Sequence, residues 1–223
     1  MNCSKRISSG RLTLLLAGGV LLAGGVGAPG LLAAPAQAGT CVTPAACSVT
    51  GTLALTAGTL NLTTSSTLTW SAAVTGSDLN VVDAIPADQL YTVVDASGAL
   101  AGWHVTVAAT TFTATGPLTL ATAGTFSTDG SLTSMTASGY PVAACTTGST
   151  CTLPLHTTTP TTFPVAITTA TSAPTPYVVY DANANTGIGS VAISPVGWWL
   201  NVPGNTKPGS YVSTISMAVI TAP

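Results

Sequence analysis

The chain has 223 residues, and only 4% of them are charged. Four are Lys or Arg and six are Asp, with no Glu, and after residue 38 the single cation is Lys207. The side-chain balance of residues 39–223 is therefore +1 − 6 = −5. Nucleic acids and anionic membrane surfaces attract proteins through clusters of Lys and Arg. Both are therefore excluded as partners.

The first 38 residues have the pattern of a secretory signal peptide. A basic start is followed by an apolar run over Leu12–Val26, and Ala36-Gln37-Ala38 offers the small residues that signal peptidase requires. We expect cleavage after Ala38, with cleavage after Ala34 and an uncleaved membrane anchor as alternatives. Later apolar runs are too short to span a bilayer. We expect residues 39–223 to be soluble or surface-bound, without membrane insertion.

Four cysteines remain after the signal peptide, in two pairs with equal spacing. Cys41 and Cys47 are separated by five residues, as are Cys145 and Cys151. Disulfides are the default in exported proteins, and four cysteines allow three pairings. We expect the two local pairings, with Cys145 and Cys151 at the base of a hairpin. Zinc is the alternative, which this spacing does not favour, and we predict no cofactor.

The residues after the first cysteine pair alternate between apolar and polar side chains, as half-buried strands do. The pattern predicts two or three strands between Val49 and Val74. Leucines alternate with small polar residues over Leu53–Thr56 and Leu60–Thr63, and a third alternating run covers Leu68–Val74. We interpret Trp70, in the third run, as a core residue.

The rest of the chain continues in short strands separated by Gly, Pro, Asp and Asn. Asp95 is expected to accept backbone hydrogen bonds in a turn, and Asp129-Gly130 predicts a hairpin. Further strands are expected in Leu79–Asp95 (two), Gly102–Thr113, Leu118–Thr136, Phe163–Thr169 (an edge strand), Tyr177–Asp181, Ile188–Ile193, Gly197–Val202 and Tyr211–Ile220.

No heptad, amphipathic helix pattern or internal repeat interrupts this series of strands. About 185 residues with short polar connections fit one domain of antiparallel strands. The fold class we predict is all-β, a single antiparallel β-sandwich of roughly ten strands over residues 39–223.

The motifs of common enzymes are absent after the signal peptide. His104 and His156 are the only histidines, and no nucleophile elbow or phosphate-binding loop accompanies them. The six carboxylates stand mostly beside Gly, Ala, Ser or Asn, where turn capping is their ordinary use. We therefore predict a protein without enzymatic activity. A secreted hydrolase, the alternative, would need one of the histidines beside an Asp.

Two stretches resemble the WxL domain of Gram-positive bacterial surface proteins. Asp95-Ala96-Ser97-Gly98 precedes Gly102–Val107, which is similar to the first Trp-x-Leu motif of that family, with Trp103 and Val105 in the motif positions. The last fifteen residues, Gly209–Pro223, are similar to the closing motif, in which Met217 and Val219 replace Trp and Leu. The likeness covers about residues 79–223 in matching order.

The resemblance implies a non-catalytic protein on the cell surface of a Gram-positive-type bacterium. Members of this family attach non-covalently to the wall, apparently through peptidoglycan, and often act beside membrane-anchored surface partners. The site residues that it implies are Trp103, Val105, Met217 and Val219.

Two further tryptophans extend the predicted ligand site. Trp198 and Trp199 are neighbours in a predicted strand, so their side chains point to opposite faces. We expect one of them to be exposed and to stack on a glycan. The alternative functions are a glycan-binding adhesin and a self-assembling structural protein, because strand edges without Lys are poorly protected against pairing with another chain.

Overall fold

The computed structural model describes residues 51–135, 139–156 and 162–222. Residues 1–53 and 54–223 form separate units, and the fold below is that of the second unit. No described residue is helical, so no helix of this part of the chain could cross a membrane. The thirteen strands of the described residues are β1 (Leu60–Thr63), β2 (Leu79–Val82), β3 (Tyr91–Asp95), β4 (Trp103–Ala109), β5 (Thr113–Ala114), β6 (Leu118–Thr119), β7 (Phe126–Asp129), β8 (Val142–Cys145), β9 (Val165–Ile167), β10 (Tyr177–Ala182), β11 (Gly189–Ser194), β12 (Gly197–Val202) and β13 (Ile215–Thr221).

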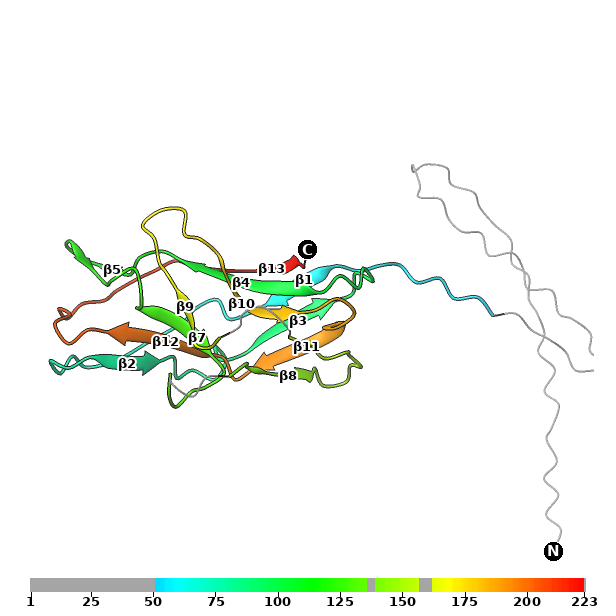
Figure 1. The fold of residues 1–223 in the computed structure, drawn as a ribbon, viewed down its shortest axis with the longest axis horizontal. Coiled ribbons are helices and arrows are strands. Elements are labelled where there is room, and N and C mark those ends of the chain that lie inside the picture. The colour runs from blue at the N-terminus through cyan, green and yellow to red at the C-terminus, as the bar shows by residue number, and fades with distance from the viewer. Residues whose placement is uncertain (1–50, 136–138, 157–161, 223) are drawn as a thin grey trace, which may run out of the picture. The chain divides into compact units, whose positions relative to one another are not determined.

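The strands form four open antiparallel sheets, which confirms the predicted fold class (Figure 1). Three sheets enclose the core, with strand orders β1-β3-β11-β8, β2-β12-β7-β9 and β10-β4-β13. The fourth is the two-stranded pair β5-β6. The arrangement is sandwich-like, and the strand count exceeds the predicted ten because several connections contain short strands of two to four residues.

One hydrophobic core joins the three larger sheets. Trp103 on β4, Tyr91 on β3 and Trp198 on β12 are all at most 2% exposed. Trp103 stacks on Tyr180, and Trp198 stacks on Phe126. The ring centroids are about 6.1 Å apart in each pair. Alternation along each strand turns the aromatic and branched side chains to one side. The three larger sheets therefore share one continuous hydrophobic core.

Two of the predicted N-terminal strands are absent, whereas Leu60–Thr63 is confirmed as β1. Residues 53–56 and 68–74 are not in any strand. In the second of these segments the polar groups bind elsewhere. The Thr69 amide donates to the Asp83 carboxylate at 2.6 Å, and the Trp70 indole donates to the Trp198 carbonyl at 2.9 Å. Alternation predicts a strand only where a neighbouring strand is available to pair with it.

The turn predictions have mixed outcomes. Asp95 accepts a hydrogen bond from the Ser97 amide at 3.0 Å, as expected. The predicted hairpin at Asp129-Gly130 is wrong, because β7 ends there and pairs with the more distant strands β12 and β9, not with a strand directly after the turn. The expected edge strand is confirmed as β9, which in the described residues pairs with β7 alone.

The disulfide between Cys145 and Cys151 is present, with an S–S distance of 2.02 Å. The hairpin expected around it is wrong: β8 pairs with β11, and Thr152 forms a bridge to Ile188. Both ends of the disulfide loop are therefore held against the same third segment. Cys41, Cys47 and the predicted signal peptide lie outside the described residues.

Candidate functional site

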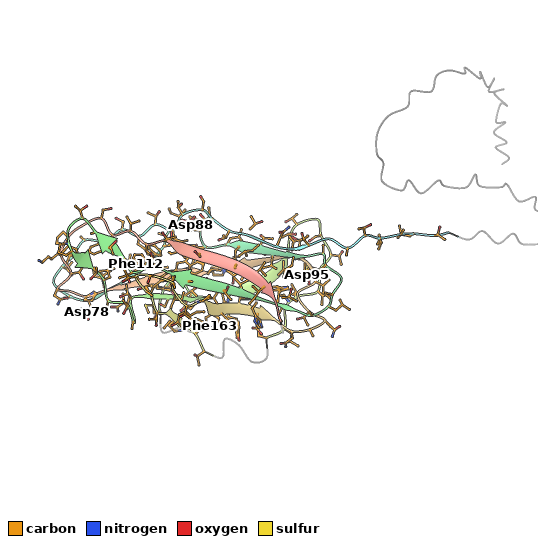
Figure 2. The ribbon with its side chains drawn as sticks, turned by 90° about the horizontal axis from the view of Figure 1, so that it is seen from above. Asp78, Asp88, Asp95, Phe112 and Phe163 are labelled. Atoms are coloured by element: carbon orange, nitrogen blue, oxygen red, sulfur yellow. A yellow bond between two sulfur atoms is a disulfide. The ribbon has the colours of Figure 1, made fainter. Side chains whose placement is uncertain are left out.

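The two WxL-like motifs lie side by side in one sheet. β4 pairs in antiparallel register with β13, so that Val105 faces Val219 and Trp103 faces Thr221. Figure 2 looks onto this sheet, with β13 and β4 adjacent. Two stretches from distant parts of the sequence thus form one continuous surface.

The first motif is entirely buried. Trp103 and Val105 are 0% exposed, and the Trp103 indole donates a 2.8 Å hydrogen bond to the Gly187 carbonyl. Gly187 has a φ of +67°, and a Cβ on it would lie 2.6 Å from the indole nitrogen. Only glycine therefore fits at this position. In this conformation Trp103 and Val105 have no surface to offer a ligand; they hold the sheet together.

The second motif is at the edge of the same sheet. β13 alternates between half-buried and exposed residues, and Met217 and Val219 are on the half-buried side. Within the described residues β13 has β4 as its only strand partner. The second motif is therefore accessible where the first is not.

The outward face of β13 is neutral. Ser216, Ala218 and Ile220 are exposed there. Their partners on β4 are Ala108, Thr106 and His104, of which Ala108 and Thr106 are buried and His104 is half-buried. The Thr106 hydroxyl donates to the Ala218 carbonyl at 3.4 Å, so its hydrogen bond is made within the sheet.

The prediction that Trp198 or Trp199 is exposed is wrong. Trp198 is 1% exposed, packs in the core and donates to the Asp88 carbonyl at 2.9 Å. Trp199, on the opposite face of β12, is 4% exposed. Its indole donates to the Ser131 carbonyl at 3.1 Å, because the loop that follows β7 covers this face. Opposite directions of neighbouring side chains do not imply exposure when both faces of a strand are covered.

An open groove of about 960 Å³ lies beside β13. One bank is the strandless segment 64–74, and the other is the chain from Thr206 to Met217. Phe112 and Leu200 are among the buried residues that line it. Met217 belongs to this lining, and the Thr64 hydroxyl donates to its sulfur at 3.5 Å. The groove therefore reaches the second motif from the side of the core.

The groove lining is apolar and hydroxyl-rich, with one cation, Lys207. Lys207 is also the only Lys or Arg after residue 38. Sequence reasoning missed this groove because it assigned 68–74 to a strand. The available signal was the run Thr64-Ser65-Ser66 directly after β1, in which the Ser65 hydroxyl donates to the Thr67 carbonyl and accepts from the Thr67 amide.

A second cluster gathers ionisable and aromatic side chains near the C-terminal end of β10. His156 Nδ1 lies 3.0 Å from Asp181 Oδ1. The imidazole also stacks on Tyr140 with ring centroids 3.9 Å apart. Sequence spacing gave no sign of this pair, which joins residues 25 positions apart. The histidine–carboxylate proximity that a hydrolase would need is thus present for His156.

Burial is the main influence on the carboxylate of this pair. Burial raises the pKa of Asp181 above its ordinary value, while the hydrogen bond from His156 and the charge of His104 oppose this rise. The same burial, with the charge of Asp181 adding to it, raises the pKa of Tyr180. Asp181 is bonded to His156 in an aromatic surrounding, and a pair of this kind occurs both in active sites and in ordinary structural contacts. Among the described residues no three His, Cys, Asp or Glu side chains come together as a metal site.

A comparison of the chain with protein-family models, curated proteins and solved structures finds no match. The resemblance to the WxL domain therefore rests on the motif residues of the sequence alone.

Proposed function

We propose that the protein is an exported, non-catalytic surface protein that associates non-covalently with the wall of a Gram-positive-type bacterium. Peptidoglycan or another wall glycan is the proposed ligand. The observation that carries this proposal is the pairing of the two motif strands. Thr106 on β4 and Ala218 on β13 are 112 positions apart in the chain and in register in one sheet.

The burial pattern assigns different roles to the two motifs. Trp103 and Val105 are positioning residues, since they are buried and fix β4 as the central strand. Contact with the wall would fall to β13, through the exposed residues Ser216, Ala218 and Ile220. A neutral face of small side chains lets sugar hydroxyls approach the backbone and the Ser and Thr hydroxyls without removing a charge from water.

Export is supported by the disulfide at Cys145 and Cys151. Such bonds persist in oxidising compartments and are rare in the cytosol. The near-absence of cations is also compatible with a protein that must not adhere to nucleic acids or membranes.

The proposal is tested by sedimenting the secreted protein with isolated cell walls. The double variant Ala218→Glu/Ile220→Glu places two negative charges on the outward face of β13, where wall binding would remove them from water. We expect its wall-bound fraction to fall about tenfold or more. The matched control, Thr115→Glu/Thr119→Glu, adds the same charge to exposed positions on and beside the β5-β6 pair and should pellet as the unmodified protein does.

Two results would contradict the proposal. If the unmodified protein stays in the supernatant, the wall is not its ligand. If both double variants lose binding equally, the wall responds to net charge and not to the β13 face.

Self-assembly into a surface structure is the second candidate function. It is favoured by the open apolar groove beside β13, together with the exposed Leu53 and Leu55 near the start of the described chain.

A further inference from the structure

We propose that the groove beside β13 binds a free aliphatic carboxylate, with its hydrocarbon chain along the groove and its carboxylate at Lys207. All the lining residues lie between Thr64 and Met217, within the unit formed by residues 54–223. Alternation along β13 turns Met217 toward the groove and Ser216 and Ala218 away from it. The proposal therefore goes beyond wall attachment through the outward face of β13 and does not depend on it.

The two banks of the groove are held by different neighbours. Residues 64–74 run between β1 and β2, and the other bank runs between β12 and β13 (Figure 1). The first bank is held by the hydrogen bonds of Thr69 and Trp70 to the residue after β2 and to β12. On the second bank, Val212 exchanges two backbone hydrogen bonds of 2.8 and 3.0 Å with Thr113. The groove between them is therefore preformed.

Both banks turn apolar side chains into the groove. Leu68 and Trp70 are half-buried while their immediate neighbours are exposed, and Ile215 and Met217 follow the same pattern on the other bank. The floor between the banks consists of buried and half-buried apolar side chains: Leu79, Val81, Phe112 (labelled in Figure 2), Leu120, Leu200 and Val202. A mainly aliphatic floor buries CH₂ groups favourably but gives sugar hydroxyls no hydrogen-bond partners. It therefore favours a hydrocarbon chain over a glycan.

The charge at the groove has one sign. Lys207 is an exposed lining residue, and none of the described lining residues is an Asp. Within the described residues Lys207 forms no ion pair. A smaller hollow of about 370 Å³ shares Lys207 and Tyr211 with the groove, so Lys207 lies where the two hollows meet. A cation without a partner beside an apolar groove complements an anionic head group.

The turn that carries Lys207 is fixed by its own hydrogen bonds. The Thr206 amide donates to the Pro203 carbonyl at 2.9 Å, and the Tyr211 hydroxyl donates to the Lys207 carbonyl at 2.9 Å. The backbone of the cation is thus in place before a ligand arrives, which lowers the entropic cost of binding.

The size of the groove and its single cation define the class of ligand. A volume of about 960 Å³ is at the upper end of the range of ordinary ligand pockets. One ammonium group balances a carboxylate, whereas a phosphate monoester carries about 1.5 to 2 negative charges at pH 7. Binding to an anionic bilayer takes a cluster of Lys and Arg, and Lys207 is the only one after residue 38. These comparisons favour a free carboxylate in solution.

The first experiment titrates the secreted protein calorimetrically with octanoate, decanoate and dodecanoate, each below the concentration at which it forms micelles. We expect the affinity to rise about fourfold for each added CH₂ group, because each is buried against the apolar floor. Decyltrimethylammonium has the chain length of decanoate and the opposite charge. It should bind about tenfold more weakly, because Lys207 repels it.

Variants locate the head group and the chain. Lys207→Gln should weaken decanoate binding about threefold to fivefold, and Lys207→Arg, which keeps the charge, should bind as the unmodified protein does. Met217→Glu places a carboxylate in the lining and should weaken binding about a hundredfold. Its matched control is Thr214→Glu, at an exposed position outside the lining, which should bind normally. Thermal unfolding verifies that each variant is folded, and the exposed Lys207 carries the test if Met217→Glu is not.

Four results would overturn the proposal. Absence of binding by all three acids would show that the groove does not take this class of ligand. An affinity independent of chain length would place the chain outside the groove. Unchanged binding by Lys207→Gln would place the head group elsewhere. Capture of the protein by phosphatidylglycerol vesicles without binding of the free acids would assign the groove to a membrane surface.

This proposal and wall attachment fail separately. A protein that binds decanoate but does not sediment with cell walls would contradict wall attachment alone. A protein that sediments with walls but binds none of the acids would contradict the groove ligand alone.

Discussion

β4 and β13 are neighbours in one sheet, yet they experience different surroundings. β4 is the central strand, and its inward residues Trp103, Val105 and Val107 are 0% exposed. β13 is an edge strand whose inward residues are only half-buried and border an open groove. Similar motifs in a sequence can therefore have unlike roles: one strand determines stability, and the other is available for recognition.

The largest expected difference between the two strands concerns the motif side chains themselves. Trp103→Ala should lower the free energy of unfolding by about 3–5 kcal/mol, because it leaves a cavity and an unpaired Gly187 carbonyl. Met217→Ala should cost about 1 kcal/mol, since its side chain is half-exposed. Chemical denaturation of both variants measures the difference. Equal losses would show that the edge strand contributes as much as the central one.

A matched pair of nearly isosteric changes sharpens the comparison. Val105 and Val219 face each other across β4 and β13. Val105→Thr buries a hydroxyl and should cost about 1–3 kcal/mol. Val219→Thr should cost less than about 0.5 kcal/mol, because water reaches its position. Thermal unfolding of the two single variants provides the measurement, and a larger loss at residue 219 would contradict the assignment of the buried strand.

A pH titration tests the surroundings of β4 and not those of β13. Asp181 on β10 pairs in register with His104 on β4, whereas β13 has no titratable side chain. The pKa of Asp181 is raised in the folded protein by burial, so the folded state binds the proton more tightly than the unfolded state. Asp181 therefore stabilises the fold below its ordinary pKa of 3.8, and this contribution is lost as pH rises through the raised value.

In that window we expect the free energy of unfolding to increase as pH falls, measured by urea denaturation at a series of pH values. Asp181→Asn should make the dependence shallower. Part of the slope should remain, because burial also raises the pKa values of Asp83 and Asp129. A variant with the slope of the unmodified protein would show that Asp181 does not titrate in this range.

Several stretches with alternating side chains were assigned correctly from the sequence, although Leu53–Thr56 and Leu68–Val74 were not. Leu60–Thr63, Gly102–Thr113 and Gly197–Val202 each contain a strand of the structure. The local disulfide was predictable as well, since five intervening residues allow the two cysteines to approach. All of these features depend on short stretches of chain.

The burial of Trp198 and Trp199 could not be read from their stretch of sequence. Both faces of β12 are covered, one by Phe126 and the other by the loop at Ser131. The groove was hidden for a related reason: the segment 68–74 alternates as a strand does but binds Asp83 and the Trp198 carbonyl instead of pairing.

The sequence by itself determined that the chain is all-β, because the period of its apolar residues is a local property. It also determined the scarcity of cations and the positions of the two motifs. Only the tertiary structure decided that β4 is buried while β13 is at an edge, that His156 meets Asp181, and that a groove lies open beside Met217. Those outcomes depend on which strands pair and which loops cover them, and contacts between distant segments are not encoded in any one stretch of residues.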